Sequence, residues 1–297
     1  MCGIAAIFRH NGHKGSIDAA SWLGIANQVQ QKRGPDGEGI WVSEDKTIGL
    51  AHRRLAIIDL SSTGAQPMAT GDGLLRITYN GEIYNYKALR TRLESQGYRF
   101  RSSSDTEVLL HLYREYGQTM VEHLRGMYAF ALWDDEKSGL FLARDPFGIK
   151  PLYYADDGHT IRVASQVKTL LAAGGTDTSP EPAGHVGFFL WGYVPEPFTL
   201  YKGIHALQAG TALWVAQGDT HPKFTTFCDV AKEIARPVDT NPDMSREEIA
   251  EALGKALQDS VRHHMVSDVP VGVFLSAGLD SISIAALATG CWGATAR

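Results

Sequence analysis

Short apolar runs separated by turn residues fill the first 175 positions, and this pattern is the strongest constraint on the fold. Six of the runs have the length and composition of β-strands, and they cover residues 4–8, 74–79, 128–133, 140–143, 152–155 and 161–164. Residues 134–139 have the character of a hairpin loop between two of them. Few helical patterns intervene, whereas parallel strands need long crossovers. The sequence therefore predicts an α+β fold of mostly antiparallel sheets with helices on their outer faces.

Two or three helical stretches are expected among these strands. Trp22, Ile25, Ala26 and Val29 have the spacing of one face of an amphipathic helix, which the turn residues 33–37 end. Further along, Ser104-Asp105-Thr106-Glu107 has the spacing of a capping box before Val108, Leu109 and Leu112.

The rest of the chain divides into two further zones. Residues 176–245 are rich in proline and turn residues, which is typical of a connecting region. A second capping-box spacing, Ser245 to Glu248, then begins a helix, and the apolar run 269–275 predicts a buried strand. One strand and two helices cannot enclose a core. We expect domains at 1–215 and 246–297 joined by a linker at 216–245, with the segment from 246 poorly packed or lying on the first domain.

Composition excludes several classes of function. The formal net charge is −5, which gives no reason to expect nucleic acid or an anionic membrane as a partner. No apolar run reaches the length of a bilayer span, and no signal peptide precedes the first strand. Three cysteines form no disulfide framework, so a reducing cytoplasm is expected. The eleven histidines form no metal-binding spacing, so no metal site is predicted.

Cys2 is the first candidate for chemistry. Removal of Met1 would place a thiol and a free α-amine on one residue. The thiolate is the nucleophilic form of cysteine, and an α-amine with a pKa of about 8 can accept its proton. By position alone, Cys2 could equally be a small buried residue beginning a strand.

Other segments offer partners for this nucleophile, each with a plainer alternative. Asn80-Gly81 could donate hydrogen bonds to an oxyanion, or form a type I′ turn. Arg54 could clamp a carboxylate with its planar fork, or lie with Arg53 on a solvated strand edge. Asp105 could bind an ammonium group, or be a first-turn acid favoured by the helix dipole.

Taken in order, the Met-Cys-Gly-Ile start and segments 33–37, 53–59, 80–85, 104–107 and 144–152 resemble the class II (N-terminal-nucleophile) glutamine amidotransferases, and most closely the glutamine-hydrolysing asparagine synthetases. The resemblance implies a four-layer αββα sandwich of two antiparallel sheets. It also implies that Cys2 attacks glutamine, Asn80 and Gly81 hold the oxyanion, and Arg54 binds the α-carboxylate. Asp105, helped by Glu82, would take the α-ammonium, and Leu55 and Ile57 would complete the glutamine site. Arg33 would lie near the pocket or the ammonia exit, while 144–152 receives no role.

A second motif lies at residues 276–281. This loop resembles the SGGxDS pyrophosphate loop of ATP pyrophosphatases, which implies ATP binding by Leu275, Ser276, Gly278, Asp280 and Ser281. Ala277 replaces the first glycine of that pattern, which is tolerable where its φ is negative. An ordinary strand–turn–helix is the alternative. The loop is not a P-loop, because GxxxxGK[ST] is absent.

The resemblance implies a glutamine-dependent asparagine synthetase, a ligase of amino-acid biosynthesis that uses glutamine, aspartate and ATP with Mg²⁺. Its glutaminase half would need no cofactor, and a homodimer is compatible with the family. We expect this chain to lack most of the synthetase domain, as a truncated α/β segment. Two alternatives stay open: a non-catalytic protein that binds glutamine or a partner, and an amidotransferase that acts on a different carboxylate.

Overall fold

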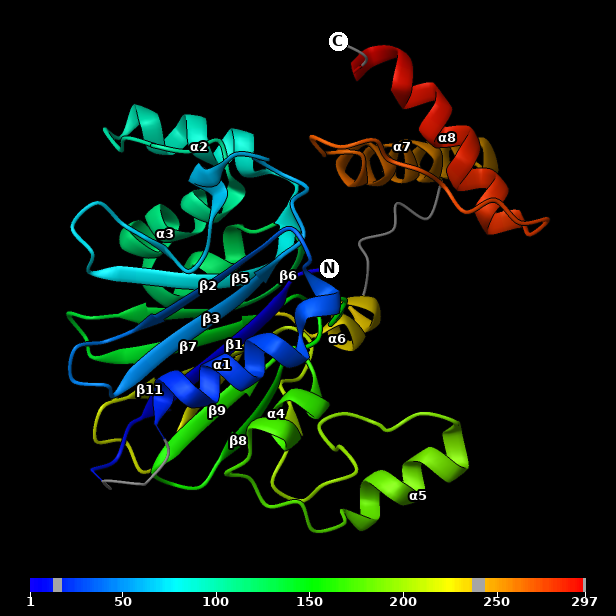
Figure 1. The fold of residues 1–297 in the computed structure, drawn as a ribbon. Helices are drawn as coiled ribbons and strands as arrows, with labels where there is room; N and C mark the ends of the chain where they lie inside the picture. The colour runs from blue at the N-terminus through cyan, green and yellow to red at the C-terminus, as the bar shows by residue number, and fades with distance from the viewer. Residues whose placement is uncertain (13–17, 237–243, 296–297) are drawn as a thin grey trace. The chain divides into compact units, whose positions relative to one another are not determined.

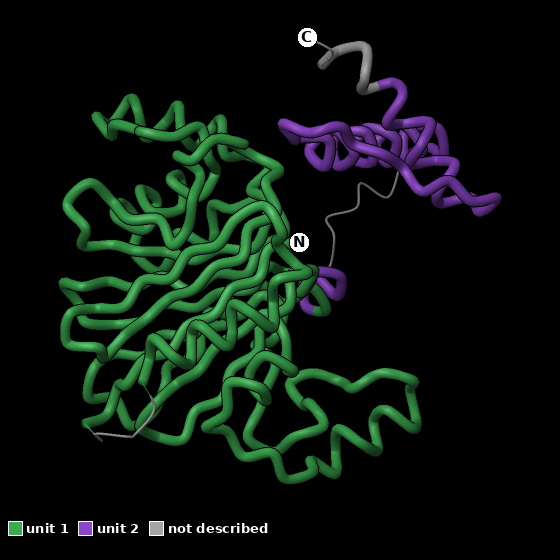
Figure 2. Tube along the Cα trace, in the orientation of Figure 1, with its two compact units in different colours: residues 1–231 green, residues 232–297 purple. Residues whose placement is uncertain are grey.

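The computed structural model describes residues 1–12, 18–236 and 244–295 (Figure 1). The chain forms two compact units, Met1–Ala231 and Lys232–Arg297 (Figure 2), and each is described by itself. The first unit extends beyond the domain end expected at residue 215. The reason is that β12 (Lys223–Thr226) pairs with β11 (Thr211–Ala216) and so extends a sheet of the first unit.

Two six-stranded sheets form the centre of the first unit. The first has the order β10-β8-β9-β1-β3-β2, with β1 at Gly3–Arg9, β2 at Gly37–Val42, β3 at Ile48–Arg54, β8 at Tyr153–Asp156, β9 at Thr160–Ala164 and β10 at His205–Ala206. The second has the order β12-β11-β7-β6-β5-β4, with β4 at Met68–Ala69, β5 at Leu75–Ile83, β6 at Gly126–Asp134 and β7 at Gly139–Arg144. Every strand pair is antiparallel. All six predicted strands are present, and residues 135–138 form the predicted hairpin loop.

Helices cover the outer face of each sheet (Figure 1). On the first sheet, α1 (Ala19–Val29) and α4 (Val167–Ala173) bury Trp22, Ala26 and Leu170 against β1. On the second, α2 (Tyr86–Ser95) and α3 (Asp105–Tyr116) form the outer layer. Within α1 the buried stripe includes Leu23, whereas Ile25 is exposed, contrary to the predicted helix face.

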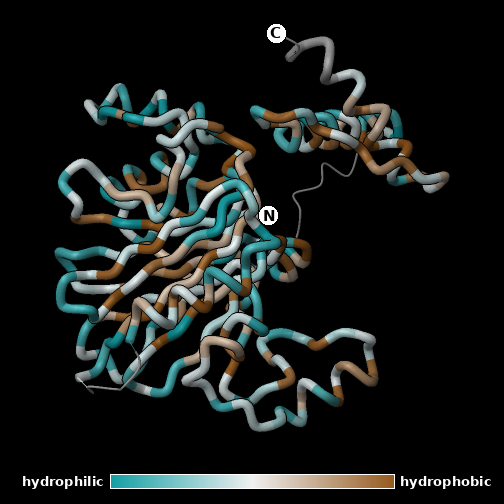
Figure 3. Tube along the Cα trace, viewed as in Figure 1, coloured by the Kyte–Doolittle hydropathy of each residue, from teal (hydrophilic) through white to brown (hydrophobic). Residues whose placement is uncertain are grey.

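Between the sheets, apolar side chains from both form one core that includes Ile4, Phe8, Leu50, Ala131 and Leu142. Figure 3 shows apolar residues recurring along the strands of both sheets. The predicted four-layer αββα arrangement of two antiparallel sheets is thus confirmed. Smaller elements connect these layers, namely η1 (Gln31–Arg33), η2 (Ser62–Gly64), η3 (Gly117–His123) and α5 (Pro182–Trp191).

Polar residues of β5 face this core at one end. The Thr78 hydroxyl donates to the Ala51 carbonyl (3.0 Å) and lies 3.1 Å from Nδ1 of His52, both on β3 of the opposite sheet. Because side chains alternate along a strand, Asn80 faces the same space as Thr78. Asn80 and Gly81 therefore lie inside a strand and form no type I′ turn.

Arg53 and Arg54 end β3, which lies between β1 and β2, so they do not lie on a sheet edge.

The second unit contains α7 (Arg246–His264) and α8 (Leu279–Thr295), while α6 (Val230–Ala235) begins at the boundary. Ser245 and Glu248 form the predicted capping box, with both reciprocal bonds present. The strand predicted at 269–275 is wrong: the segment has no regular structure, because no described strand lies beside it to pair with its backbone. Phe274, Leu275 and Leu279 are exposed, as expected for a poorly packed segment.

No helix in the described part of the chain is both long and apolar enough to cross a bilayer.

Candidate active site

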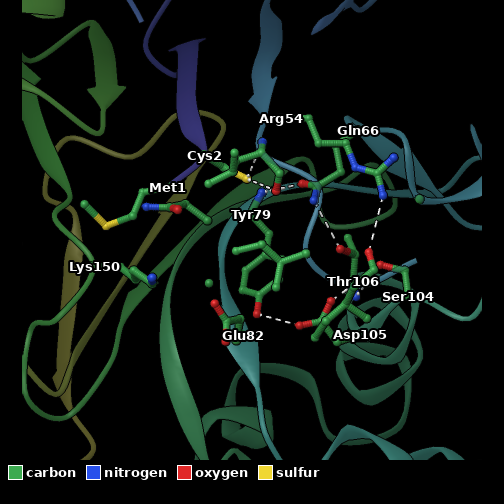
Figure 4. A pocket seen from close by; sticks show the side chains of 16 residues that line it. Met1, Cys2, Arg54, Gln66, Tyr79, Glu82, Ser104, Asp105, Thr106 and Lys150 are labelled. Carbon is green, nitrogen blue, oxygen red and sulfur yellow. Dashed lines mark hydrogen bonds between the residues drawn. The ribbon is translucent and has the colours of Figure 1, made fainter. Parts of the chain in front are cut away.

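A pocket of about 210 Å³ opens beside the start of β1, the end of β3 and the middle of β5 (Figure 4). All eight residues expected to bind or hydrolyse glutamine line it, and these are Cys2, Arg54, Leu55, Ile57, Asn80, Gly81, Glu82 and Asp105. They come from positions up to 103 residues apart in the sequence (105 − 2). The cavity is smaller than the roughly 300–1,000 Å³ typical of drug-sized ligands, which suits a small metabolite.

The Cys2 thiol is held by the backbone of the residue that follows β3. Its Sγ accepts a hydrogen bond from the Leu55 N–H at 3.3 Å and lies 3.6 Å from the Leu55 carbonyl oxygen. Burial raises the pKa of this thiol, and the Leu55 N–H bond lowers it in part. Met1 precedes Cys2 in the structure, and burial lowers the pKa of its α-amine. Deprotonating Cys2 therefore requires help from neighbouring groups.

Asn80 offers an unused donor in the same pocket as this sulfur. Its side chain is 1% exposed, and its Nδ2 has no hydrogen-bond partner among the described residues. Leaving a buried donor unpaired costs about 1–3 kcal/mol, so the amide is positioned for a ligand at the expense of stability.

At Gly81, a Cβ would lie 2.3 Å from the Met127 carbonyl oxygen of β6. The structure thus shows strand packing, rather than approach to a ligand, as the reason for glycine there.

Arg54 is engaged by the loop that follows β3. Nη1 donates to the Ser61 carbonyl at 2.8 Å, and Nη2 donates to the carbonyls of Ile58 (3.4 Å) and Asp59. A guanidinium has five N–H donors, so two are left beyond these three bonds. Arg54 thus fixes one wall of the pocket and keeps capacity for a carboxylate.

Asp105 lies at the first turn of α3. Its Oδ2 accepts hydrogen bonds from the Tyr79 hydroxyl (2.8 Å) and the Ile83 N–H (3.0 Å). Burial raises the pKa of Asp105 to about 6, although those two hydrogen bonds lower it, and the charge of Glu82 raises it further. At neutral pH it is therefore a buried anion to which a ligand cation would bind favourably.

The cap before α3 differs from the prediction. Ser104 caps the helix by accepting from the Thr106 N–H at 3.2 Å. The Glu107 carboxylate instead accepts from the N–H groups of Arg101 (3.0 Å) and Ser102 (2.7 Å), so the expected bond to Ser104 is replaced. This arrangement fixes the turn that precedes Asp105.

Several lining residues escaped the sequence reasoning. Gln66 links two walls, because Oε1 accepts from the Tyr79 N–H (2.7 Å) and Nε2 donates to the Thr106 hydroxyl (3.1 Å). Lys150 enters from segment 144–152, to which no role was given. Arg33 does lie near the site as expected, since its Nε donates to the Cys2 carbonyl at 2.9 Å.

The expected phosphate loop lies in the second unit, apart from these residues in sequence. The Ser281 hydroxyl accepts from the Ser276 N–H (3.2 Å), and the Ser276 hydroxyl accepts from the Gly278 N–H (3.2 Å). Ala277 is not among the non-glycine residues with positive φ, so its methyl group causes no backbone strain. Leu275, Ser276, Gly278, Asp280 and Ser281 are all exposed or partly exposed.

A search of the described side chains for three or more His, Cys, Asp or Glu residues arranged around a metal found no such group.

Fold and pocket together define an αββα sandwich with a cysteine in its pocket, and comparison with known proteins identifies the class. The family model described as "Glutamine amidotransferase domain" matches residues 1–227, and the model described as "Asparagine synthase" matches residues 252–293. The chain belongs to the glutamine amidotransferase family.

Among relatives, the chain is 39% identical to "Asparagine synthetase [glutamine-hydrolyzing] 1" of Bacillus subtilis over 97% of its own length and 44% of the relative. It is 34% identical to "Amidase chry2" of Gibberella zeae, over 97% of its own length and 42% of the relative. The chain therefore spans less than half the length of these two proteins.

The fold matches a solved glutamine phosphoribosylpyrophosphate amidotransferase of B. subtilis with a TM-score of 0.56. That match has 21% identity and covers 98% of this chain and 64% of the other.

Proposed function

We propose that the first unit hydrolyses the side-chain amide of glutamine, with Cys2 as nucleophile, and supplies ammonia for the ATP-dependent amidation of aspartate to asparagine. The family membership and the B. subtilis relative support this proposal. The observation that carries it is the buried Asn80 amide with its unused Nδ2 donor, in the same small pocket as the Cys2 thiol.

The proposed first step begins once Met1 has been removed. The Cys2 α-amine takes the thiol proton, and the sulfur attacks the glutamine carboxamide carbon. Asn80 Nδ2 and the Gly81 N–H donate to the oxyanion that forms. Collapse of this intermediate breaks the C–N bond, the amine returns its proton to the leaving nitrogen, and ammonia departs. Water then hydrolyses the γ-glutamyl thioester, which gives glutamate and regenerates the thiol.

The same pocket would hold the amino-acid end of glutamine. Asp105 is a buried carboxylate suited to the α-ammonium, and Glu82 adds negative charge beside it. The remaining donors of Arg54 suit the α-carboxylate. Leu55 and Ile57 border the cavity and would contact the methylene groups between them.

ATP and Mg²⁺ belong to the amidation half of the proposal. The Ser276 and Ser281 hydroxyls and the start of α8 are donors of the kind that hold a pyrophosphate. In this chain those hydroxyls are hydrogen-bonded to each other (2.8 Å), and the segment before them pairs with no strand. Because no described strand of this chain encloses the loop, we derive no adenylation step from these residues.

A different carboxylate acceptor is the second candidate. The similarity to a protein named as an amidase, at 34% identity over the same 97% of the chain, favours it. Both candidates share the glutaminase and differ in the acceptor. Because the thiol must stay reduced to act, we place the protein in the cytoplasm. A homodimer also remains a prediction.

One experiment tests the proposal. Purified wild-type protein and its Cys2→Ala variant are incubated with glutamine, and glutamate is measured with and without ATP, Mg²⁺ and aspartate. We expect glutamate from the wild type and none above background from the variant. Equal glutamate from both would remove Cys2 from the mechanism. Asparagine in the complete mixture would support aspartate as the acceptor, and its absence alongside glutamate would favour the second candidate.

A further inference from the structure

Lys150 is a buried cation in the pocket that the catalytic scheme above leaves without a role. Its side chain is 5% exposed and lines the same cavity as Cys2 and Glu82. Figure 4 shows it pointing into the pocket on the side where Met1 lies. Burial lowers the pKa of this ammonium, and the negative charges of Glu82, Cys2 and Asp145 act against that effect. Burying a charged group is costly, so its position calls for a function.

The segment that carries Lys150 is held on both sides of this residue. The Asp145 carboxylate accepts from the N–H groups of Ile149 and Lys150, each at 3.0 Å. Arg144 donates through Nε to the Lys150 carbonyl (2.9 Å) and through Nη2 to the Gly148 carbonyl (2.7 Å). The turn at 144–150 thus fixes the backbone from which this side chain enters the pocket.

Glycine is required at position 148 of this turn. Gly148 has a φ of +62°, and a Cβ there would lie 2.9 Å from Nη2 of Arg144. The Arg144 guanidinium further donates to Glu196 and to the Leu207 carbonyl, both at 2.6 Å. These bonds fix the position of the Lys150 Cα at the edge of the pocket.

Other charged groups face the same end of the pocket. On the positive side, Arg33 donates to the Cys2 carbonyl, and Arg54 is bonded to the loop after β3. Arg33 also has a buried Nη2 without a hydrogen-bond partner among the described residues. The acidic and titratable groups facing it are Glu82 and Tyr79 of β5, Asp105 of α3 and Asp145 of its own turn.

These charges act on the reacting groups in a definite direction. Burial raises the pKa of the Cys2 thiol, whereas the charges of Lys150 and Arg54 lower it. Burial lowers the pKa of the Met1 α-amine, which precedes Cys2 in the structure, and the charges of Lys150 and Arg33 lower it further, whereas those of Cys2 and Glu82 raise it. A fully protonated thiol–ammonium pair must lose one proton before it can attack. A cation in the same pocket as the thiol favours that loss at lower pH.

We propose that Lys150 is a positioning residue whose ammonium keeps the Cys2 thiol–amine pair in its singly deprotonated, nucleophilic form at neutral pH. This inference rests on the glutaminase proposed above. Lys150 itself takes and gives no proton in the reaction. The proton that leaves Sγ goes to the α-amine, and the lysine stabilises the thiolate that is left.

The test measures how fast Cys2 is alkylated by iodoacetamide between pH 5 and 9, read from the N-terminal peptide by mass spectrometry. The proteins are the wild type, Lys150→Met, Lys150→Gln, Lys150→Arg and the exposed-site control Lys168→Met. We expect the two neutral variants to move the midpoint of the profile up by about one pH unit and to lower the rate at pH 7 up to tenfold. Lys150→Arg should restore most of the shift, and Lys168→Met should leave the profile unchanged.

Two results would overturn the proposal. One is a Lys150→Met or Lys150→Gln profile that superimposes on the wild type. The other is an equal loss of rate at every pH, which would mean that the variants only disturb the structure. Alkylation needs no glutamine, so a wild type that forms no glutamate would count against the glutaminase, whereas an unshifted profile would count against Lys150. The acid limb of kcat/KM for glutamine should shift with the alkylation profile.

Discussion

Replacing Asn80 with alanine should separate activity from stability. The unused Nδ2 donor is 1% exposed and has no partner among the described residues, so its removal breaks no hydrogen bond of that donor in the free protein. Removing one oxyanion donor typically costs about 2.7–4 kcal/mol of transition-state stabilisation, a fall of 10²–10³ in kcat. The unpaired amide itself costs about 1–3 kcal/mol in the native state. This offsets the lost packing, so we expect the free energy of unfolding to change by less than about 1 kcal/mol.

Thr78 is the matched control, two residues earlier on the same face of β5. Its hydroxyl donates to the Ala51 carbonyl and lies within hydrogen-bond distance of Nδ1 of His52, so Thr78→Val removes two buried hydrogen bonds. We expect about 2–3 kcal/mol of lost stability with kcat within a few-fold of the wild type. Glutamate release and urea unfolding measure both quantities. An Asn80→Ala protein with wild-type kcat, or one that loses as much stability as Thr78→Val, would refute the reasoning.

Three further predictions follow from buried positions. Gly81→Ala should destabilise the protein by at least about 1–3 kcal/mol in urea unfolding, because its Cβ would lie 2.3 Å from the Met127 carbonyl oxygen. Asp105→Asn should make the free energy of unfolding rise more steeply between pH 4 and 6, by up to about 1.4 kcal/mol per pH unit. His52→Gln should make the free energy of unfolding fall with pH between pH 4 and 6.

The signs of the two pH effects follow from the directions of the shifts. Asp105 has a folded pKa of about 6, above its unfolded value, so the folded state holds more protons between pH 4 and 6 and stability falls as pH rises. His52 is buried, which lowers its pKa to about 3, so the unfolded state holds more protons there and stability rises with pH. The two slopes oppose each other in the wild type. Parallel pH profiles for all three proteins would contradict both assignments.

Regular apolar runs made six of the twelve described strands predictable, and function explains the absence of such a run in one of the others. The β3 strand (Ile48–Arg54) ends in His52, Arg53 and Arg54, whose polar side chains interrupt the apolar pattern because they serve the pocket and its support. Sequences depart from local rules most often at such sites. Conversely, the apolar run 269–275 forms no strand, because a strand needs neighbours that its own sequence cannot reveal.

Some residues of the candidate site could be predicted from the sequence, and others could not. Cys2, Asn80 and Asp105 lie in short motifs and could be proposed from sequence alone. Lys150 could not, because its place depends on a turn whose hydrogen bonds run through Arg144 and Asp145. Only the folded chain shows that this turn ends in the pocket.

The most direct test of the central claim is covalent labelling of the wild-type protein with a chloroketone analogue of glutamine, followed by peptide mass spectrometry. The account predicts a single adduct on Cys2, on a peptide that lacks Met1 and has a free α-amine, and protection of that adduct by excess glutamine. A retained Met1, an adduct on Cys228 instead, or labelling that glutamine does not slow would contradict it.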